Sequence, residues 1–174
     1  DWVSRQIKDK FYQQKKIQGF RSRSAFKLLE INEKFNFIKN NSYVLDLGSF
    51  PGGWSQVLEK KINRGKIVAL DILPMEKINN IDFILGDFLN KSVQSKISKI
   101  FEHQIDIVVS DMASNTTGNR DLDSYRTAEL TLNAMNFSKT ILNENGVFLS
   151  KFFMGSDFKE IKKTANLIFK KVIL

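Results

Sequence analysis

Short apolar runs alternate with longer amphipathic segments along most of the chain. Runs rich in Val, Ile and Leu predict strands, and apolar positions that recur every three or four residues predict helices. The predicted strands are Tyr43–Leu47, Lys66–Asp71, Asp82–Leu85, Ile105–Asp111 and Gly146–Phe153. The predicted helices cover residues 4–18 and 22–35, and then Trp54–Ile62, Ser92–Phe101, Leu122–Leu142 and Asp157–Phe169. Lys171–Leu174 resembles the beginning of another strand.

This alternation predicts an α/β domain with a mostly parallel, Rossmann-like sheet that has helices on both faces. The 174 residues contain no repeat and no long linker, so we expect a single domain over residues 1–174. Because the chain stops inside an apolar run at Leu174, we expect that the C-terminal end of this domain is not included. No apolar run approaches the roughly 18 residues of a membrane-spanning helix, so no membrane association is expected.

The net charge of +8 is concentrated near the N-terminus. Residues 1–42 hold ten basic and four acidic residues, which leaves a net charge of only +2 for the remainder. A basic, helical N-terminal extension over residues 1–42 indicates a polyanionic partner, with a solubilising surface as the alternative. The sequence has no cysteine and no apolar leader, which is typical of a cytoplasmic protein and excludes a thiol nucleophile.

The segment YVLDLGSFPGGW, from Tyr43 to Trp54, combines a predicted strand, a glycine-rich turn and the start of a helix. Glycines allow a backbone to approach a ligand closely, and a helix N-terminus offers free N–H groups. Such a loop predicts a nucleotide or cofactor pocket at the carboxyl edge of a parallel sheet. Its glycine spacing departs from the G-x-G-x-x-G pattern of dinucleotide-binding folds, which disfavours an NAD-dependent dehydrogenase.

Four acidic residues stand at or near the ends of four successive predicted strands: Asp46, Asp71, Asp87 and Asp111. Asp71 could accept hydrogen bonds from ribose hydroxyls, and Asp87 from an adenine amino group. Taken singly, each could instead form a turn or a helix cap. Together they favour a ligand with hydroxyls, an adenine and a positive charge, and S-adenosylmethionine has all three.

Two lysines are candidates for the chemistry. Lys151 interrupts the apolar strand GVFLSKFF, where a lysine ordinarily needs an acidic partner. Lys27 lies on the predicted helix RSRSAFKLLEI, where on its own a solvent-exposed position is the simpler interpretation. The chain offers no His/Cys/acid cluster that predicts a metal site, and its single histidine, His103, is expected at the surface.

Six segments in this order resemble the FtsJ/RlmE family of ribosomal RNA large-subunit 2′-O-ribose methyltransferases: GFRSRSAFKLLEI, DLGSFPGGWSQ, ALDILPM, GDF, VVSDMASN and GVFLSKFF. The resemblance runs over essentially the whole chain. It implies a Rossmann-like S-adenosylmethionine-dependent methyltransferase that methylates the 2′-hydroxyl of a ribose in RNA. The implied target is a uridine in the A-loop of large-subunit rRNA, either free or in assembled large subunits.

The resemblance also implies roles for individual residues. Lys27, Asp111 and Lys151 match the catalytic Lys-Asp-Lys set of the family. The matching cofactor contacts are Gly52, Trp54, Asp71, Asp87 and Asp111. The fourth catalytic residue of the family, a glutamate, is expected beyond Leu174. Two positions depart from the family pattern: Ser114 stands where proline is usual, and Phe50 where a small residue is usual.

We expect a neutral Lys151 to take the proton of the ribose hydroxyl, with Lys27 as the nearby cation and Asp111 orienting the amines. Alignment of the reacting atoms should provide much of the rate. Phosphates next to the target would be bound by basic residues near the N-terminus: Arg5, Lys8, Lys10, Lys15, Lys16, Arg21 and Arg23. Alternatives are a tRNA 2′-O-methyltransferase and a non-catalytic RNA-binding or ribosome-assembly factor with this fold. We expect a monomer.

Overall fold

The computed structural model describes residues 19–112, 117–152, 155 and 157–174. The predicted helix over residues 4–18 lies outside the described residues, as do Ser114 and Phe153. The described helices are α2 (Ser24–Phe35), α3 (Gly53–Lys61), α4 (Lys91–Phe101), α5 (Arg120–Ile141) and α6 (Phe158–Ile168). The strands are β1 (Tyr43–Leu47), β2 (Lys66–Asp71), β3 (Ile81–Leu85), β4 (Ile105–Ser110) and β5 (Leu142–Ser150).

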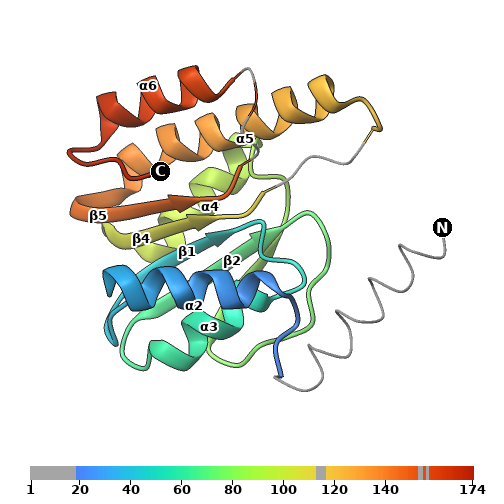
Figure 1. Cartoon of the computed structure of the whole chain (residues 1–174). Coiled ribbons are helices and arrows are strands. Elements are labelled where there is room, and N and C mark those ends of the chain that lie inside the picture. The colour runs from blue at the N-terminus through green and yellow to red at the C-terminus, as the bar shows by residue number, and fades with distance from the viewer. Residues whose placement is uncertain (1–18, 113–116, 153–154, 156) are drawn as a thin grey trace.

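The five strands form one sheet in the order β3-β2-β1-β4-β5, and every neighbouring pair is parallel (Figure 1). The predicted α/β class with a parallel sheet is confirmed. The central strands are buried along almost their whole length, which explains why they appear in the sequence as continuous apolar runs. None of the helices in the described ranges is long and apolar enough to cross a membrane.

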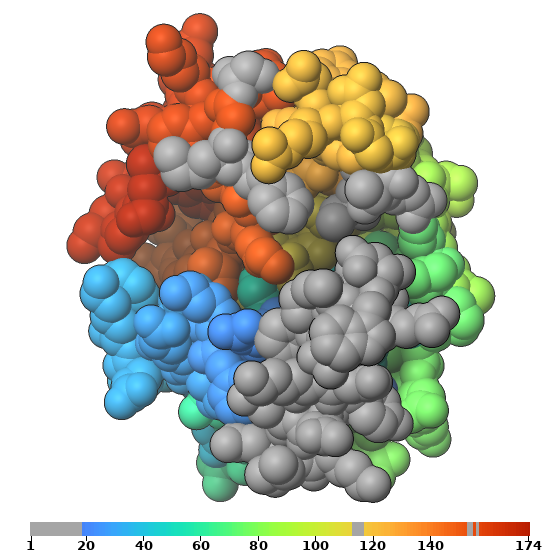
Figure 2. Space-filling model, turned by 45° about the vertical axis from the view of Figure 1, so that its right-hand side comes forward, coloured from blue at the N-terminus to red at the C-terminus, as the bar shows by residue number. Residues whose placement is uncertain are grey.

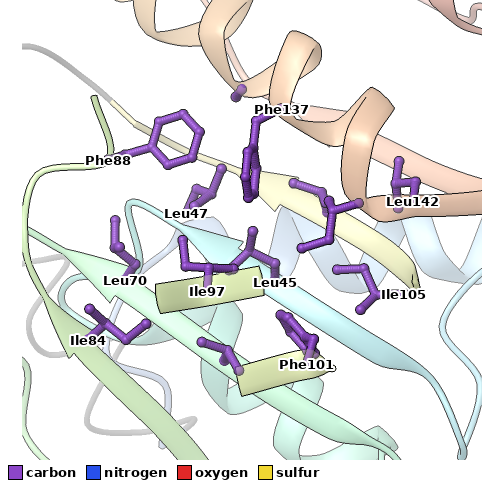
Figure 3. Packing of buried hydrophobic residues seen from close by; sticks show 14 residues of the cluster. Leu45, Leu47, Leu70, Ile84, Phe88, Ile97, Phe101, Ile105, Phe137 and Leu142 are labelled. Atoms are coloured by element: carbon purple, nitrogen blue, oxygen red, sulfur yellow. The ribbon is translucent and has the colours of Figure 1, made fainter. Parts of the chain in front are cut away.

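Helices cover both faces of the sheet. On one face, α4 and α5 pack on a cluster that includes Leu45, Val68 and Ile97 (Figure 3). Phe88 and Phe137 meet edge to face in this cluster, with ring centroids 5.5 Å apart. The helix α6 packs on α5 rather than directly on the sheet centre, through a smaller cluster that contains Ile161 and Ala165.

On the other face, α2 and α3 pack against the sheet. Ala25 and Leu28 of α2 are completely buried, in one cluster with Val44 of β1 and Val57 of α3. The same cluster reaches β5, and Figure 2 shows the blue surface of α2 next to the orange surface of the β5 region. From Ser24 onward, therefore, the basic N-terminal segment contributes to the hydrophobic core of the domain.

The strand β5 begins earlier than its apolar run predicts. Leu142 pairs with Ile105, and the register between the two strands then shifts before Val147 pairs with Ile107. The intervening residues form an irregularity that the apolar pattern, which starts at Gly146, does not reveal. Beyond α6, residues 171–174 form no strand.

Candidate active site

A cavity of about 380 Å³ opens at the carboxyl edge of the sheet. Three of the four predicted acids line it: Asp71 at the end of β2, Asp87 after β3 and Asp111 after β4. The wall between them is largely apolar and consists of Phe50, Leu70, Ile72, Leu73, Phe88, Leu89, Met112 and Leu130. A cavity lined by carboxylates and apolar side chains suits a ligand with a flat apolar ring and hydrogen-bond donors.

A larger groove of about 640 Å³ lies between β5, α5, α6 and the last residues of the chain. It contains none of the predicted site residues, and it lies along the outer strand rather than at the carboxyl edge of the central strands. Because ligands of parallel α/β sheets bind at that carboxyl edge, we place the candidate active site in the smaller cavity.

The carboxylates of Asp71 and Asp87 also organise the loops in which they lie. Asp71 Oδ2 accepts a hydrogen bond from the Phe50 N–H at 2.9 Å, and Asp71 Oδ1 accepts one from the Leu73 N–H at 2.9 Å. Asp87 Oδ1 accepts from the Leu89 N–H at 2.9 Å. A carboxylate has about four lone-pair sites, so these bonds leave acceptor capacity for a ligand.

Asp111 and Lys151 are brought together by the pairing of β4 with β5. Ser110 is in register with Ser150, and the Lys151 N–H donates to the Ser110 carbonyl at 3.0 Å, so the next residues of the two strands lie side by side. Lys151 Nζ lies 3.7 Å from Asp111 Oδ1. Burial raises the pKa of Asp111, and the Lys151 ammonium opposes this rise.

Lys27 has a different partner in the structure. Its Nζ lies 3.5 Å from Glu30 Oε2 on the same helix, and both side chains are largely exposed. An exposed pair of this kind contributes little to stability, so it does not fix the position of the amine. The structure thus brings together Asp111 and Lys151 of the predicted catalytic set and pairs Lys27 with Glu30.

Gly48 permits a close approach between the loops after β1 and β4. Its φ is 72°, and a Cβ at this position would lie 2.8 Å from the backbone of Asp111 and Met112. A side chain at Gly48 would therefore displace the backbone that carries Asp111. In the sequence, this glycine is recognisable only as part of a loop, because its partner lies more than sixty residues away.

Gly52 and Trp54 are not among the residues that line the cavity. The Trp54 side chain is 4% exposed and packs with Ala25 and Leu28, while its indole N–H donates to the Ser24 carbonyl at 2.8 Å. The ring therefore contributes to the packing of α2 on α3. Any contact of Trp54 with a cofactor has to come from its backbone at the start of α3.

Solved structures with this architecture place the chain in the class of Rossmann-like methyltransferases. A Plasmodium falciparum protein described as a ribosomal RNA methyltransferase is 33% identical, with a TM-score of 0.80 over 88% of this chain and 90% of that chain. Fibrillarin from Aeropyrum pernix, solved with S-adenosyl-L-methionine, shares the fold at 17% identity. Its TM-score is 0.54 over 74% of this chain and 56% of that chain.

Residues 20–174 match the FtsJ-like methyltransferases, and the chain belongs to this family of S-adenosylmethionine-dependent enzymes. Ribosomal RNA large subunit methyltransferase E of Pelagibacter ubique is 45% identical over 172 residues, which cover 99% of this chain and 85% of the relative. The proteins of the same name from Acinetobacter baumannii and Rickettsia akari are 42% and 39% identical, over 93% and 99% of this chain and 76% and 78% of the relatives. The predicted family and the predicted enzyme class are confirmed.

Proposed function

We propose that this chain transfers a methyl group from S-adenosylmethionine to a ribose 2′-hydroxyl of large-subunit rRNA. The single observation that supports this most directly is the Asp111–Lys151 pair at the rim of the carboxylate-lined cavity. The names of the relatives described above point to the same RNA, since they are ribosomal RNA large subunit methyltransferases. The finer target is a uridine of the A-loop, as the family resemblance implies.

The cavity suits S-adenosylmethionine in size and chemistry. Its volume of about 380 Å³ lies in the range of small-molecule sites. Asp71 would accept hydrogen bonds from the ribose hydroxyls of the cofactor, and Asp87 from its adenine amino group. Ile72 and Leu89 would supply apolar contacts to the adenine ring. When bound, the cofactor supplies an electrophilic methyl group next to a positive charge, which the carboxylate of Asp111 would stabilise.

Gly52 and Trp54 would act through the backbone at the start of α3. The N–H groups of the first helical turn have no partner within the helix and can serve a ligand. Gly52, with a φ of 120°, is the residue that precedes this turn. The cofactor contacts assigned to Gly52 and Trp54 would therefore come from backbone groups rather than from their side chains.

Lys151 is the residue that would remove the proton from the 2′-hydroxyl. Its side chain is 57% exposed beside a half-buried Asp111, so its amine can reach an incoming ribose while the carboxylate holds it at the cavity. A lysine accepts a proton only in its neutral form, and a second cation nearby favours that form. Lys27 would be this cation once RNA is bound. Its amine would then leave Glu30 and move to the active site.

Single-turnover methylation tests this assignment. We expect Lys151→Ala to lower the rate by about 10²–10⁴-fold, the usual contribution of a general base. S-adenosylhomocysteine binding, measured by isothermal titration calorimetry, should remain within about threefold, because the alanine removes no cavity-lining side chain. Lys163→Ala, which removes an exposed lysine of α6, is the matched control and should behave as the wild type. Near-normal turnover of Lys151→Ala would contradict the role of Lys151 as the base.

The substrate is tested with isolated large subunits, free rRNA and tRNA, followed by mass spectrometry of nuclease digests to locate the methyl group. Methylation of a ribose in the large-subunit RNA is the expected result. Methylation of tRNA alone would overturn the proposed substrate. Absence of methyl transfer to any of the three RNAs, with S-adenosylhomocysteine still bound, would favour a non-catalytic assembly factor.

A further inference from the structure

The guanidinium of Arg21 connects the loop after β1 with the loop after β2. Its Nη1 donates to the Pro51 carbonyl at 3.3 Å and to the Glu76 carbonyl at 2.7 Å, and its Nη2 donates to the Lys77 carbonyl at 3.3 Å. The two loops are about 25 residues apart in the sequence, and the three carbonyls converge on one side chain. The ion pair with the Glu76 carboxylate is weak by comparison, at 4.0 Å to an almost fully exposed side chain.

The backbone around Arg21 is held in place from α3. The Arg21 N–H donates to Gln56 Oε1 at 2.7 Å, and Gln56 Nε2 donates to the Gly19 carbonyl at 3.0 Å. Gly52 provides the space for the side chain, because a Cβ there would lie 3.0 Å from Arg21 Nη1 and 3.1 Å from its Cδ. The position of Arg21 is therefore fixed at both its backbone and its guanidinium.

The two connected loops are walls of the cavity. Phe50, the neighbour of Pro51, lines it, and so do Ile72 and Leu73 at the start of the second loop. From the cavity side, Asp71 ties these loops together through the N–H groups of Phe50 and Leu73. Arg21 is not among the lining residues, so it holds the same two loops from behind.

We propose that Arg21 is a positioning residue for the cofactor: its guanidinium holds the loop at Pro51 and the loop at Glu76–Lys77 at the spacing that S-adenosylmethionine requires. This inference rests on the proposed function, which places the cofactor in the cavity. It changes the interpretation of Arg21 from the sequence, in which this residue is one of several phosphate ligands for RNA. Only 24% of the side chain is exposed, and both of its terminal nitrogens are engaged by carbonyls.

The test compares Arg21→Gln, Arg21→Lys and the matched control Lys77→Gln in the full chain. The control removes one positive charge from the loop after β2 but keeps the Lys77 backbone carbonyl, which accepts a hydrogen bond from Arg21. S-adenosylhomocysteine affinity is measured by isothermal titration calorimetry without RNA. We expect the dissociation constant of Arg21→Gln to rise about tenfold or more, equivalent to about 1.4 kcal/mol. Lys77→Gln should stay within about twofold of the wild type, a change of less than about 0.5 kcal/mol.

Arg21→Lys should recover part of the affinity. An ammonium offers three donors from a single point and cannot span three carbonyls as the planar guanidinium does. Kinetics with rRNA at saturating S-adenosylmethionine provide a second readout, in which the KM for RNA of the two Arg21 variants should stay near the wild-type value. A purely structural role would instead lower the urea midpoint and the apparent affinity for both substrates together. If Arg21→Gln does not fold, the comparison between Arg21→Lys and the wild type decides.

Besides that signature of a purely structural role, two results would overturn the inference. One is an unchanged S-adenosylhomocysteine affinity in both Arg21 variants while the wild type binds. The other is a raised KM for RNA together with a salt dependence of RNA binding that is smaller by about one phosphate contact, the signature of a phosphate ligand. Failure of the wild type to bind S-adenosylhomocysteine would refute the proposed function itself, so the two failures are distinguishable.

Discussion

The buried carboxyl group of Asp46 should make the stability of this domain depend on pH. Asp46 is completely buried in β1, and its Oδ2 accepts a hydrogen bond from Ser55 Oγ at 2.6 Å. Within the described part of the chain, its Oδ1 has no hydrogen-bond partner. Burial raises the pKa of Asp46 from 3.8 to about 7; the bond from Ser55 opposes this rise, and the charges of Asp111 and Asp71 add to it.

The sign of the effect follows from proton binding. The unfolded chain loses the Asp46 proton near pH 3.8, whereas the folded chain keeps it up to about pH 7. In this window the folded state binds more protons, so the free energy of unfolding falls as the pH rises. The difference between the two pKa values, 3.8 and about 7, corresponds to about 4 kcal/mol of unfolding free energy. Of this contribution, about 2.5 kcal/mol is lost between about pH 5 and pH 8.

Urea unfolding of the wild type and of Asp46→Asn, followed by circular dichroism over this pH range, measures the effect. An amide does not titrate, so the free energy of unfolding of Asp46→Asn should lack the pH dependence that Asp46 causes. The difference in this free energy, variant minus wild type, should therefore rise by about 2.5 kcal/mol from pH 5 to pH 8. Other titrating groups, including Asp111 with its raised pKa, are present in both proteins and largely cancel in the difference. Parallel pH profiles for the two proteins would refute the reasoning.

Three further substitutions test other contacts. Trp54→Phe keeps an aromatic ring but loses the bond to the Ser24 carbonyl, so urea unfolding should show a loss of about 0.5–1.5 kcal/mol; an unchanged midpoint would contradict this. Leu28→Ala removes a completely buried side chain of α2, so the free energy of unfolding, measured in urea, should fall by about 2–5 kcal/mol. A negligible loss would contradict the placement of α2 in the core. Asp71→Asn replaces one of two loop acceptors with a donor, so calorimetry should show S-adenosylhomocysteine affinity reduced about tenfold or more; unchanged affinity would argue against Asp71 as a cofactor ligand.

The central strands could be predicted from the sequence because their burial is nearly uniform. The observed bounds of β1 and β2 equal the predicted ones, since both faces of these strands are covered and Val, Ile and Leu fill them. The start of β5 could not be predicted in this way. Leu142 continues the pattern of the preceding helix, and only its pairing with Ile105 makes it the first residue of the strand.

The candidate site was predictable where a residue follows directly from the end of a strand. Asp71, Asp87 and Asp111 reach one cavity because parallel strands bring their carboxyl ends to one edge. Asp46 follows the same pattern but is buried behind the loop, since its side chain points toward Ser55 of α3. Asp46 is in register with Ala69 of β2 and Val109 of β4, two residues before the level of Asp71 and Asp111, and the sequence of a single strand does not reveal this register.

The glycines of the loop are a second case in which the sequence predicts a contact but not the residue that makes it. The segment GGW signals a close approach in the sequence, but it does not reveal what approaches. In the structure, Gly52 accommodates Arg21, a Cβ at Gly53 would overlap Ser22 Oγ, and Trp54 donates to the Ser24 carbonyl. Three consecutive residues at the start of α3 thus face residues 21–24, the segment that leads into α2 and includes its first residue.

This matching explains physically why the motifs GFRSRSAFKLLEI and DLGSFPGGWSQ occur together. They form one packing unit. The first motif supplies the side chains of Arg21 and Ser22, and the second supplies the space at its glycines, the Gln56 acceptor for the Arg21 N–H and the Trp54 donor to the Ser24 carbonyl. A side chain larger than glycine at position 53 would push the 19–24 segment away and release Arg21 from Pro51. The shape of the cofactor loop is therefore set as much by residues 19–24 as by its own glycines. A substitution in either motif should change the shape of the cavity.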